Sequence, residues 1–253
     1  MEPAEDWTSL RPGPVNLSLL PSLSTTPTSW TTITDAHTPG PHREAAMGEL
    51  ISRYHDVVER YLRVKLRDQH LADEILQEFF IKLLNGKLAG ADPNKGRFRD
   101  YLRTVLHRLI VDHFRTKKLQ PLPPGDLLDP SESDIEFDRV WREAVLKRVW
   151  SRLETFEART PKNRYFTVLK LRVADADAAI ENLAKRLGEK QGVEVSPEAF
   201  RKTLQRARGK FFEFLVEELR STLHPSGPED IEAEIFDFGL GNLYRRYISE
   251  ASA

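Results

Sequence analysis

A stretch rich in basic and aromatic side chains runs from Lys95 to Lys118. Its basic members are Lys95, Arg97, Arg99, Arg103, Arg108, Arg115, Lys117 and Lys118. Arg99, Arg103 and His107 recur every four residues, so a helix would place them on one face, which we expect opposite the apolar stripe. Guanidinium groups on a rigid helix suit a phosphate backbone. The pattern therefore indicates nucleic-acid binding.

Aromatic rings are interleaved with these cations. Phe98, Tyr101, His107 and Phe114 could stack on unpaired bases, and each stacked base contributes roughly 1–3 kcal/mol. On charge alone the alternative is equally good: a solvated charged face with aromatic residues in the core. The segment therefore predicts a surface for opened strands without excluding a purely structural role.

A second basic helix follows a short one near the end of the chain. Ser196-Pro197-Glu198 is a helix start, and the short helix before it ends at Gly188. The exposed face expected for the second helix carries Arg201, Lys202, Gln205, Arg206, Arg208 and Lys210. Arg and Gln read guanine and adenine edges, and a helix N-terminus such as that at Ser196 favours phosphate. The pair is typical of a helix-turn-helix, although the connection at 188–195 is longer than usual. An ordinary amphipathic helix is the alternative.

A third group of polar side chains is acidic. Asp73, Glu74, Gln77 and Glu78 cluster beside Phe79 and Phe80 on one predicted helix. An acidic face repels DNA, so it favours a protein partner. A role in solubility alone is about as good an explanation of these residues by themselves.

The sequence offers little for catalysis. Its histidines show no metal-ligand spacing, there is no phosphate-cradling glycine loop, and there is no cysteine. Asp112 and His113 are adjacent on a helix and point apart, which makes them a poor acid–base pair. We expect no enzyme activity, no cofactor and no metal.

The elements that must position these surfaces are all helical. Apolar residues recur at spacings of three and four throughout, and no segment alternates convincingly with period two. The fold class predicted is all-α, with two small helical domains. Their expected organisation is a disordered extension at 1–28, a first domain at 29–118, a proline-rich linker at 119–134, a second domain at 135–223 and an acidic tail at 224–253.

Composition limits the setting more than the function. The formal net charge of −1 provides no global attraction to nucleic acid, so the uneven distribution of charge carries the argument. There is no apolar run long enough for a membrane span and no signal-peptide pattern at the start. We expect a cytoplasmic protein.

At this point the sequence resembles a known family. The segments LADEILQEFFIKLL and GRFRDYLRTVLHRLIVDHFR look like domain 2 of extracytoplasmic-function sigma factors, and IENLAKRLGEKQGVEVSPEAFRKTLQRARGKFFEFLVEEL looks like their domain 4. The opening SWTTI and the ending RARGKFFEFLVEEL are similar to sets found in planctomycete-like bacteria. The order of the two segments, with a proline-rich linker between them, strengthens the resemblance.

The resemblance implies a division of labour. The acidic helix would dock on the β′ clamp helices of core RNA polymerase through Asp73, Glu74, Gln77 and Glu78. The promoter −10 element would be melted and held by Arg97, Arg99, Arg103, His107, Arg108 and Arg115, although Arg108 stands where the family usually has Asn. The −35 element would be read as duplex by Ser196, Arg201, Lys202, Gln205, Arg206 and Arg208. The β flap of the polymerase and an anti-sigma factor are further candidate partners.

Two rival interpretations stay open from the residues. A polymerase-independent helix-turn-helix regulator would use only the second domain and bind duplex tightly on its own. A helical protein–protein adaptor would not need basic helices in separate domains and would show no salt-dependent affinity for DNA.

Overall fold

The computed structural model describes residues 29–87, 97–117, 130–160, 162–222 and 228–251. Each of these ranges is helical or connects helices, and none contains a strand, so the all-α prediction is confirmed. Contacts divide the chain into two compact units. Of the described residues, the N-terminal unit comprises 29–87, 97–117, 130–145 and 220–222, and the C-terminal unit comprises 146–160, 162–219 and 228–251.

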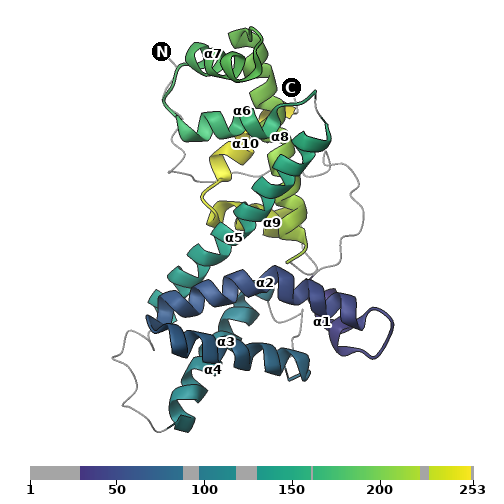
Figure 1. The fold of residues 1–253 in the computed structure, drawn as a ribbon, viewed down its shortest axis with the longest axis vertical. Helices are drawn as coiled ribbons and strands as arrows, with labels where there is room; N and C mark the ends of the chain where they lie inside the picture. Colours follow the sequence, from purple (N-terminus) through teal and green to yellow (C-terminus); the bar gives the residue numbers. More distant parts are fainter. Residues whose placement is uncertain (1–28, 88–96, 118–129, 161, 223–227, 252–253) are drawn as a thin grey trace. The chain divides into compact units, whose positions relative to one another are not determined.

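The N-terminal unit is built from α1 (Ser29–His37), α2 (Arg43–Leu66), α3 (Gln69–Leu84), α4 (Phe98–Lys117) and the first half of α5 (Pro130–Arg159), shown in Figure 1. Its core comes from the apolar stripes of these helices. The largest side chains that it buries completely are Tyr61, Leu62, Ile75, Leu106, Phe137 and Trp141. Burial of such side chains is the main stabilising contribution of a small helical domain.

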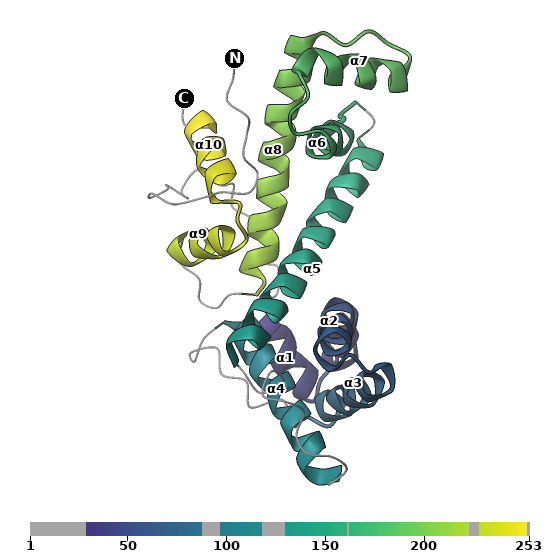
Figure 2. The same cartoon turned by 90° about the vertical axis from the view of Figure 1, so that its left-hand side faces the viewer.

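A tight turn aligns α2 with α3. Helix α2 ends because Arg67 adopts the left-handed conformation at φ 54°, and its N–H donates to the carbonyl of Arg63 at 3.1 Å. The next residue, Asp68, caps α3, since its carboxylate accepts the N–H of Leu71 at 3.1 Å. Two consecutive residues therefore end one helix and begin the next, and α3 lies beside α2 (Figure 2).

The first half of α5 belongs to the N-terminal unit. Trp141 is 1% exposed, and its ring stacks on Tyr54 of α2 at 5.8 Å and lies 6.4 Å from Phe98 of α4. An ion pair between Arg60 and Glu143 adds a polar contact at the surface. The hydrogen bond from Arg60 lowers the pKa of Glu143, despite an opposing effect of desolvation. The division between the units therefore falls at Val145 within α5, whereas the linker expected at 119–134 lies mostly outside the described residues.

The C-terminal unit contains the second half of α5, α6 (Tyr165–Ala174), α7 (Ile180–Gln191), α8 (Pro197–Arg220), α9 (Pro228–Asp237) and α10 (Gly241–Ala251). Helix α10 packs on α8: the ring of Tyr244 lies 5.3 Å from that of Phe212, and Tyr247 stacks on Phe212 at 5.5 Å. Gly209 leaves room for this contact, because a Cβ there would lie 3.1 Å from the ring of Tyr247.

The segment expected to be an acidic tail is thus mostly folded into this unit. Ile231 and Ile235 of α9, Phe238 just after it and Tyr244 of α10 are all buried. The acidic side chains Glu229 and Asp230 lie in the first turn of α9, where they favour the helix N-terminus. The expected extension at 1–28 lies outside the described residues.

Candidate nucleic-acid and partner surfaces

The acidic side chains predicted to meet a protein partner share one exposed side of α3. Glu74 and Gln77 are exposed, and Asp73 and Glu78 are half-buried. The same side continues past them into apolar residues: Ile81 is 56% exposed and Leu84 is 48% exposed. We name the six residues 73, 74, 77, 78, 81 and 84 the α3 face. Acidic side chains beside exposed apolar ones suit the binding of a protein partner. Burial of the apolar side chains would stabilise the complex, and the charges would determine which partner binds.

Sequence reasoning missed the apolar end of this face. A helix with apolar residues at 75, 79 and 83 needs only that stripe for its core, so Ile81 and Leu84 fall on the outside by spacing alone. The signal was present in the sequence as hydrophobic residues surplus to that stripe.

His113 connects α4 to the α3 face. Its Nε2 lies 3.5 Å from an oxygen of Glu74, and its Nδ1 lies 3.9 Å from an oxygen of Glu78. The histidine side chain is only 10% exposed, so packing holds it in place. The acidic partners of His113 are therefore Glu74 and Glu78 of α3, and not Asp112, its neighbour in the sequence.

The basic side of α4 is less exposed than expected. Arg99 is 5% exposed, and its Nε lies 3.5 Å from Asp138 of α5. Arg103 lies 3.2 Å from Asp100 and 3.8 Å from the same oxygen of Asp138. The expected placement of Arg99 on a face opposite the apolar stripe is thus wrong, because α5 covers that part of α4. Asp138, which the sequence reasoning did not single out, lies within ion-pair distance of both arginines.

The C-terminal half of α4 remains accessible. Arg108 and Arg115 are exposed, whereas His107 and Phe114 are half-buried. Burial raises the pKa of Tyr101, and the nearby Arg108 opposes that rise. Arg97 is half-buried, and its guanidinium donates to Asp100 at 3.2 Å.

The rings on α4 divide in the same way. Phe98 is 3% exposed and lies against Tyr54 at 4.8 Å, so it belongs to the core and is not placed for base stacking. Tyr101, His107 and Phe114 are half-buried and keep part of their rings accessible. The face of α4 that opened strands could reach is therefore carried by its second half and by Tyr101.

Helices α7 and α8 are the pair that the sequence predicts as a helix-turn-helix. Helix α7 continues past Gly188 to Gln191 and ends at Gly192, whose φ of 67° closes the helix in the left-handed region. Val193 donates its N–H to the carbonyl of Gly188 at 3.2 Å. Ser196 then caps α8, with its hydroxyl accepting the N–H of Ala199 at 3.1 Å. The expectation of a long connection from 188 to 195 is wrong, because one more turn of helix consumes its first half.

The outer side of α8 presents the predicted base-reading side chains. Lys202, Gln205 and Arg206 are exposed. Arg201 is exposed too, but lies 3.1 Å from Glu181 at the start of α7. Arg208 is half-buried and Ser196 is exposed as the cap.

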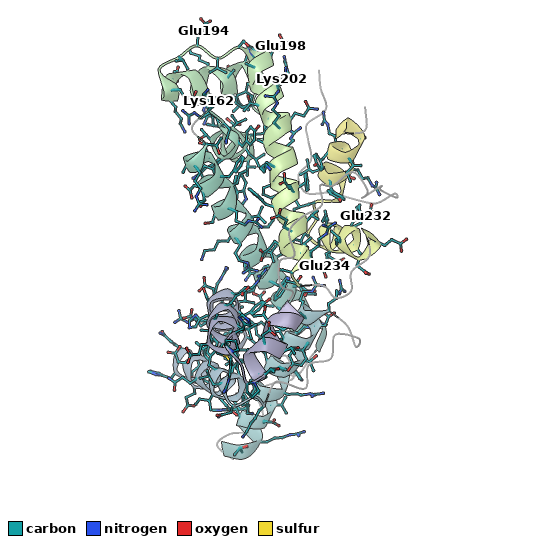
Figure 3. The ribbon with its side chains drawn as sticks, turned by 90° about the vertical axis from the view of Figure 1, so that its right-hand side faces the viewer. Lys162, Glu194, Glu198, Lys202, Glu232 and Glu234 are labelled. Atoms are coloured by element: carbon teal, nitrogen blue, oxygen red, sulfur yellow. The ribbon has the colours of Figure 1, made fainter. Side chains whose placement is uncertain are left out.

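Acidic side chains also lie at this end of the molecule. Glu194 and Glu198 stand with Lys202 around the turn and the first turns of α8 (Figure 3). A carboxylate at the start of a recognition helix can accept from the amino group of cytosine, so Glu198 joins the candidate base-reading residues. Sequence reasoning weighed Glu198 only as a helix-start signal.

Gly188 makes this turn possible, and its replacement by Ala should disrupt it. A Cβ at position 188 would lie 2.6 Å from the backbone oxygen of Val193. A backbone atom cannot move away as the end of a flexible side chain could, so the turn itself would have to shift. We expect Gly188→Ala to lower the free energy of unfolding of the C-terminal unit by about 1–3 kcal/mol and to weaken duplex binding. Chemical denaturation followed by hydrogen exchange in α7 and α8 would measure this.

Gly48→Ala is the matched control for Gly188→Ala. It lies in the interior of α2 on an exposed side, and a Cβ there meets no atom within 4 Å. The control should stabilise the protein by up to about 1 kcal/mol, since Ala is the better helix former. A stabilising effect at both positions would show that the turn does not pass against Gly188.

None of the described helices combines the length and the apolar character needed to cross a membrane.

Comparison with known proteins finds a family match in the N-terminal unit. Residues 50–120 match the family described as Sigma-70 region 2, a range that contains the α3 face and all of α4. The chain is also 29% identical over 89 residues to the ECF RNA polymerase sigma factor BldN of Streptomyces coelicolor. That alignment covers 34% of this chain and 33% of the relative, so the chain spans about a third of the length of the protein it matches. No solved structure matches. The matched range covers most of α2 and all of α3 and α4, and this part of the chain is thus similar to sigma-70 region 2.

Proposed function

We propose that the protein is an RNA polymerase sigma factor of the extracytoplasmic-function type, which directs core polymerase to promoters and assists strand opening. The observation that carries the proposal is the sigma-70 region 2 match at residues 50–120. In this range an acidic and apolar helix face lies beside a helix with a basic second half. The chain would act as a specificity subunit rather than an enzyme, in the cytoplasm where bacterial transcription takes place.

Each surface has a proposed partner. The α3 face would dock on the β′ clamp helices, and Glu74 and Glu78 would be held in position by His113. The accessible half of α4, with His107, Arg108 and Arg115, would contact the opened −10 element. Arg99 would act differently, as a structural link between α4 and α5 through Asp138.

The helix-turn-helix of α7 and α8 would read the −35 element as duplex. Ser196, Lys202, Gln205 and Arg206 are accessible for this, and Arg201 becomes available if its pair with Glu181 opens. Arg208 is half-buried and would contribute by packing or at the edge of the interface. The C-terminal unit would also meet the β flap of the polymerase, and an anti-sigma factor is a further proposed partner.

In vitro transcription tests the proposal. The full chain would be added to core RNA polymerase with fragments of its own genome as template, and transcript starts would be mapped. Starts that require the chain and share an upstream and a downstream element support the sigma assignment. Tight duplex binding by the free chain, with no effect on core polymerase, would instead favour the polymerase-independent regulator.

The cations of α8 should account for part of the salt dependence of promoter binding. Each phosphate contact releases counterions, so Lys202→Ala and Arg206→Ala should each reduce the slope of log K against log salt by about 0.9 if the residue contacts phosphate. A residue that reads a base should instead cost roughly 1–3 kcal/mol at one base position. Titration of holoenzyme with duplex promoter at several salt concentrations separates the two roles.

Arg246→Ala is the control for this measurement. Arg246 is an exposed cation of the same unit but lies on α10, outside the helix-turn-helix. It should leave the slope unchanged. An equal reduction by all three variants would mean that net charge, rather than α8, determines the affinity.

A further inference from the structure

A group of potential metal ligands lies on α2, apart from the α3 face and the basic helices. Within the described part of the chain, His55, Asp56 and Glu59 offer a ring nitrogen and two carboxylate oxygens that all lie within 4.8 Å of one another. Their spacing places the three side chains on one arc of the helix, since residues one turn apart share a side and their neighbour lies next to it.

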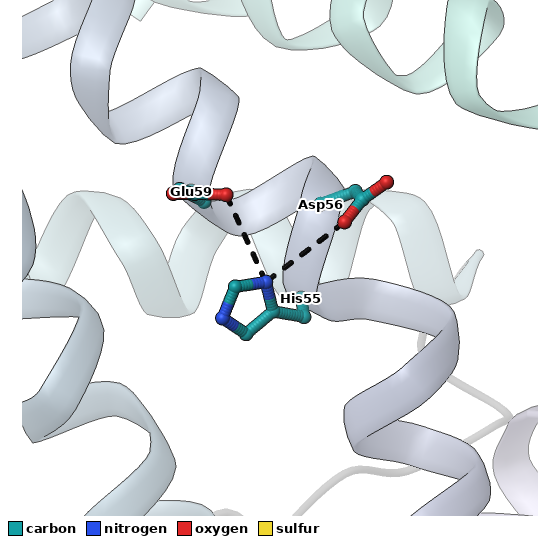
Figure 4. A group of neighbouring side chains, drawn as sticks. All are labelled: His55, Asp56 and Glu59. Atoms are coloured by element: carbon teal, nitrogen blue, oxygen red, sulfur yellow. Dashed lines mark ion pairs between the residues drawn. The ribbon is translucent and has the colours of Figure 1, made fainter.

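Both carboxylates lie near the same histidine nitrogen. Nδ1 of His55 lies 3.9 Å from an oxygen of Asp56 and 3.8 Å from an oxygen of Glu59. Figure 4 shows both carboxylates directed at this same ring nitrogen. Ligands bound to Zn²⁺ at 2.0–2.2 Å in a tetrahedral site stand about 3.3 Å apart. Small adjustments of side-chain rotamers would therefore bring the set to bonding distance.

Neighbouring residues already hold two of the ligands. The ring of His55 stacks on Phe80 of α3 at 5.4 Å with an angle of 13° between the planes. Glu59 pairs with Arg63 at 2.8 Å through its other oxygen, Oε1, which leaves Oε2 directed at the histidine. Outer contacts that orient first ligands are a regular feature of metal sites in proteins. These contacts with Phe80 and Arg63 also distinguish the group from surface acids that no neighbouring side chain orients.

The donor chemistry selects the class of metal. One imidazole nitrogen with two carboxylates suits late first-row divalent ions such as Zn²⁺, Co²⁺ and Ni²⁺, whereas Mg²⁺ and Ca²⁺ prefer oxygen alone. The remaining coordination positions would be filled by water, because the group is at the surface.

We propose that His55, Asp56 and Glu59 form a binding site for a late first-row divalent metal ion, with Zn²⁺ as its representative. The bound ion fixes the His55 ring against Phe80 and so links α2 to α3 on the side of the N-terminal unit where these two residues meet. The site is independent of the function proposed above.

Titration of the full chain with Co²⁺ and Zn²⁺ tests the site. Absorption of bound Co²⁺ in the visible range reports the ligand set, and calorimetry with Zn²⁺ reports stoichiometry and affinity. We expect one saturable equivalent that persists in millimolar Mg²⁺. His55→Gln and Glu59→Gln should each weaken binding at least 10-fold while the far-ultraviolet circular dichroism stays unchanged.

His42→Gln is the matched control, because His42 is an exposed histidine that no described acid pairs with. It should bind Zn²⁺ like the wild type. Three results would overturn the proposal: no saturable binding of either ion, binding that survives His55→Gln, or displacement by millimolar Mg²⁺. Loss of binding in His42→Gln would equally overturn it, since the ion would then be held elsewhere.

Discussion

Replacing Asp73 and Glu78 by Lys is expected to abolish co-purification of the protein with core RNA polymerase. Both residues belong to the α3 face, and neither side chain is buried. A partner surface complementary to carboxylates would meet two ammonium groups instead, so attraction becomes repulsion. Like charges across an interface cost several kcal/mol, and a loss of about 3 kcal/mol corresponds to more than 100-fold in Kd.

The control for this prediction carries the same change in net charge. Glu229 and Asp230 are exposed acids in the first turn of α9 in the C-terminal unit. Their replacement by Lys should leave binding to core polymerase within about twofold. Circular dichroism and thermal melting would establish that both double variants are folded. Undiminished co-purification of the Asp73 and Glu78 variant would show that polymerase docks on another surface.

Trp141→Ala should destabilise the N-terminal unit strongly although position 141 lies outside the region 2 match. The indole is completely enclosed and contacts rings from α2, α4 and α5. Truncation of a buried Trp leaves a cavity and costs about 3–5 kcal/mol. Hydrogen exchange measured by mass spectrometry on the full chain should show faster exchange in α2 and α4, with α8 little changed.

Trp150→Ala tests the same helix on the other side of the division. Trp150 lies two and a half turns further along α5, where its ring contacts Phe166 at 5.9 Å and Phe211 at 5.5 Å in the C-terminal unit. Its truncation should accelerate exchange in α6 and α8 instead. If each variant accelerated exchange equally in the helices of both units, the chain would unfold as one cooperative body. The division at Val145 would then not separate two independently stable units.

The helical fold was predictable because its signals are local. Apolar spacing of three and four residues, the proline and glycine breaks and the serine before α8 identify helices without knowledge of their neighbours. The acidic residues of α3 and the polar side chains of Lys202, Gln205 and Arg206 on α8 reach the surface for the same reason, since an amphipathic stripe decides which side of a helix faces outward.

Arg99 shows where this reasoning stops. Its spacing places it with Arg103 on a polar side of α4, yet α5 covers that side and supplies Asp138 as the partner. The sequence between them includes a proline-rich segment, which favoured a separation of the domains there. Only the packing of Phe137 and Trp141 into the N-terminal core shows that α5 returns to this unit.

The sequence by itself determined the fold class, the identity of most helices and the distribution of charge among them, because each depends on residues within a few turns of one another. Tertiary structure decided which polar faces stay open, where the units divide, that 228–251 folds against α8, and that His113 meets Glu74 and Glu78. These outcomes depend on contacts between residues far apart in the chain. Such contacts are stabilised by burial of side chains and by ion pairs between helices. A local sequence pattern does not indicate which helix will cover which.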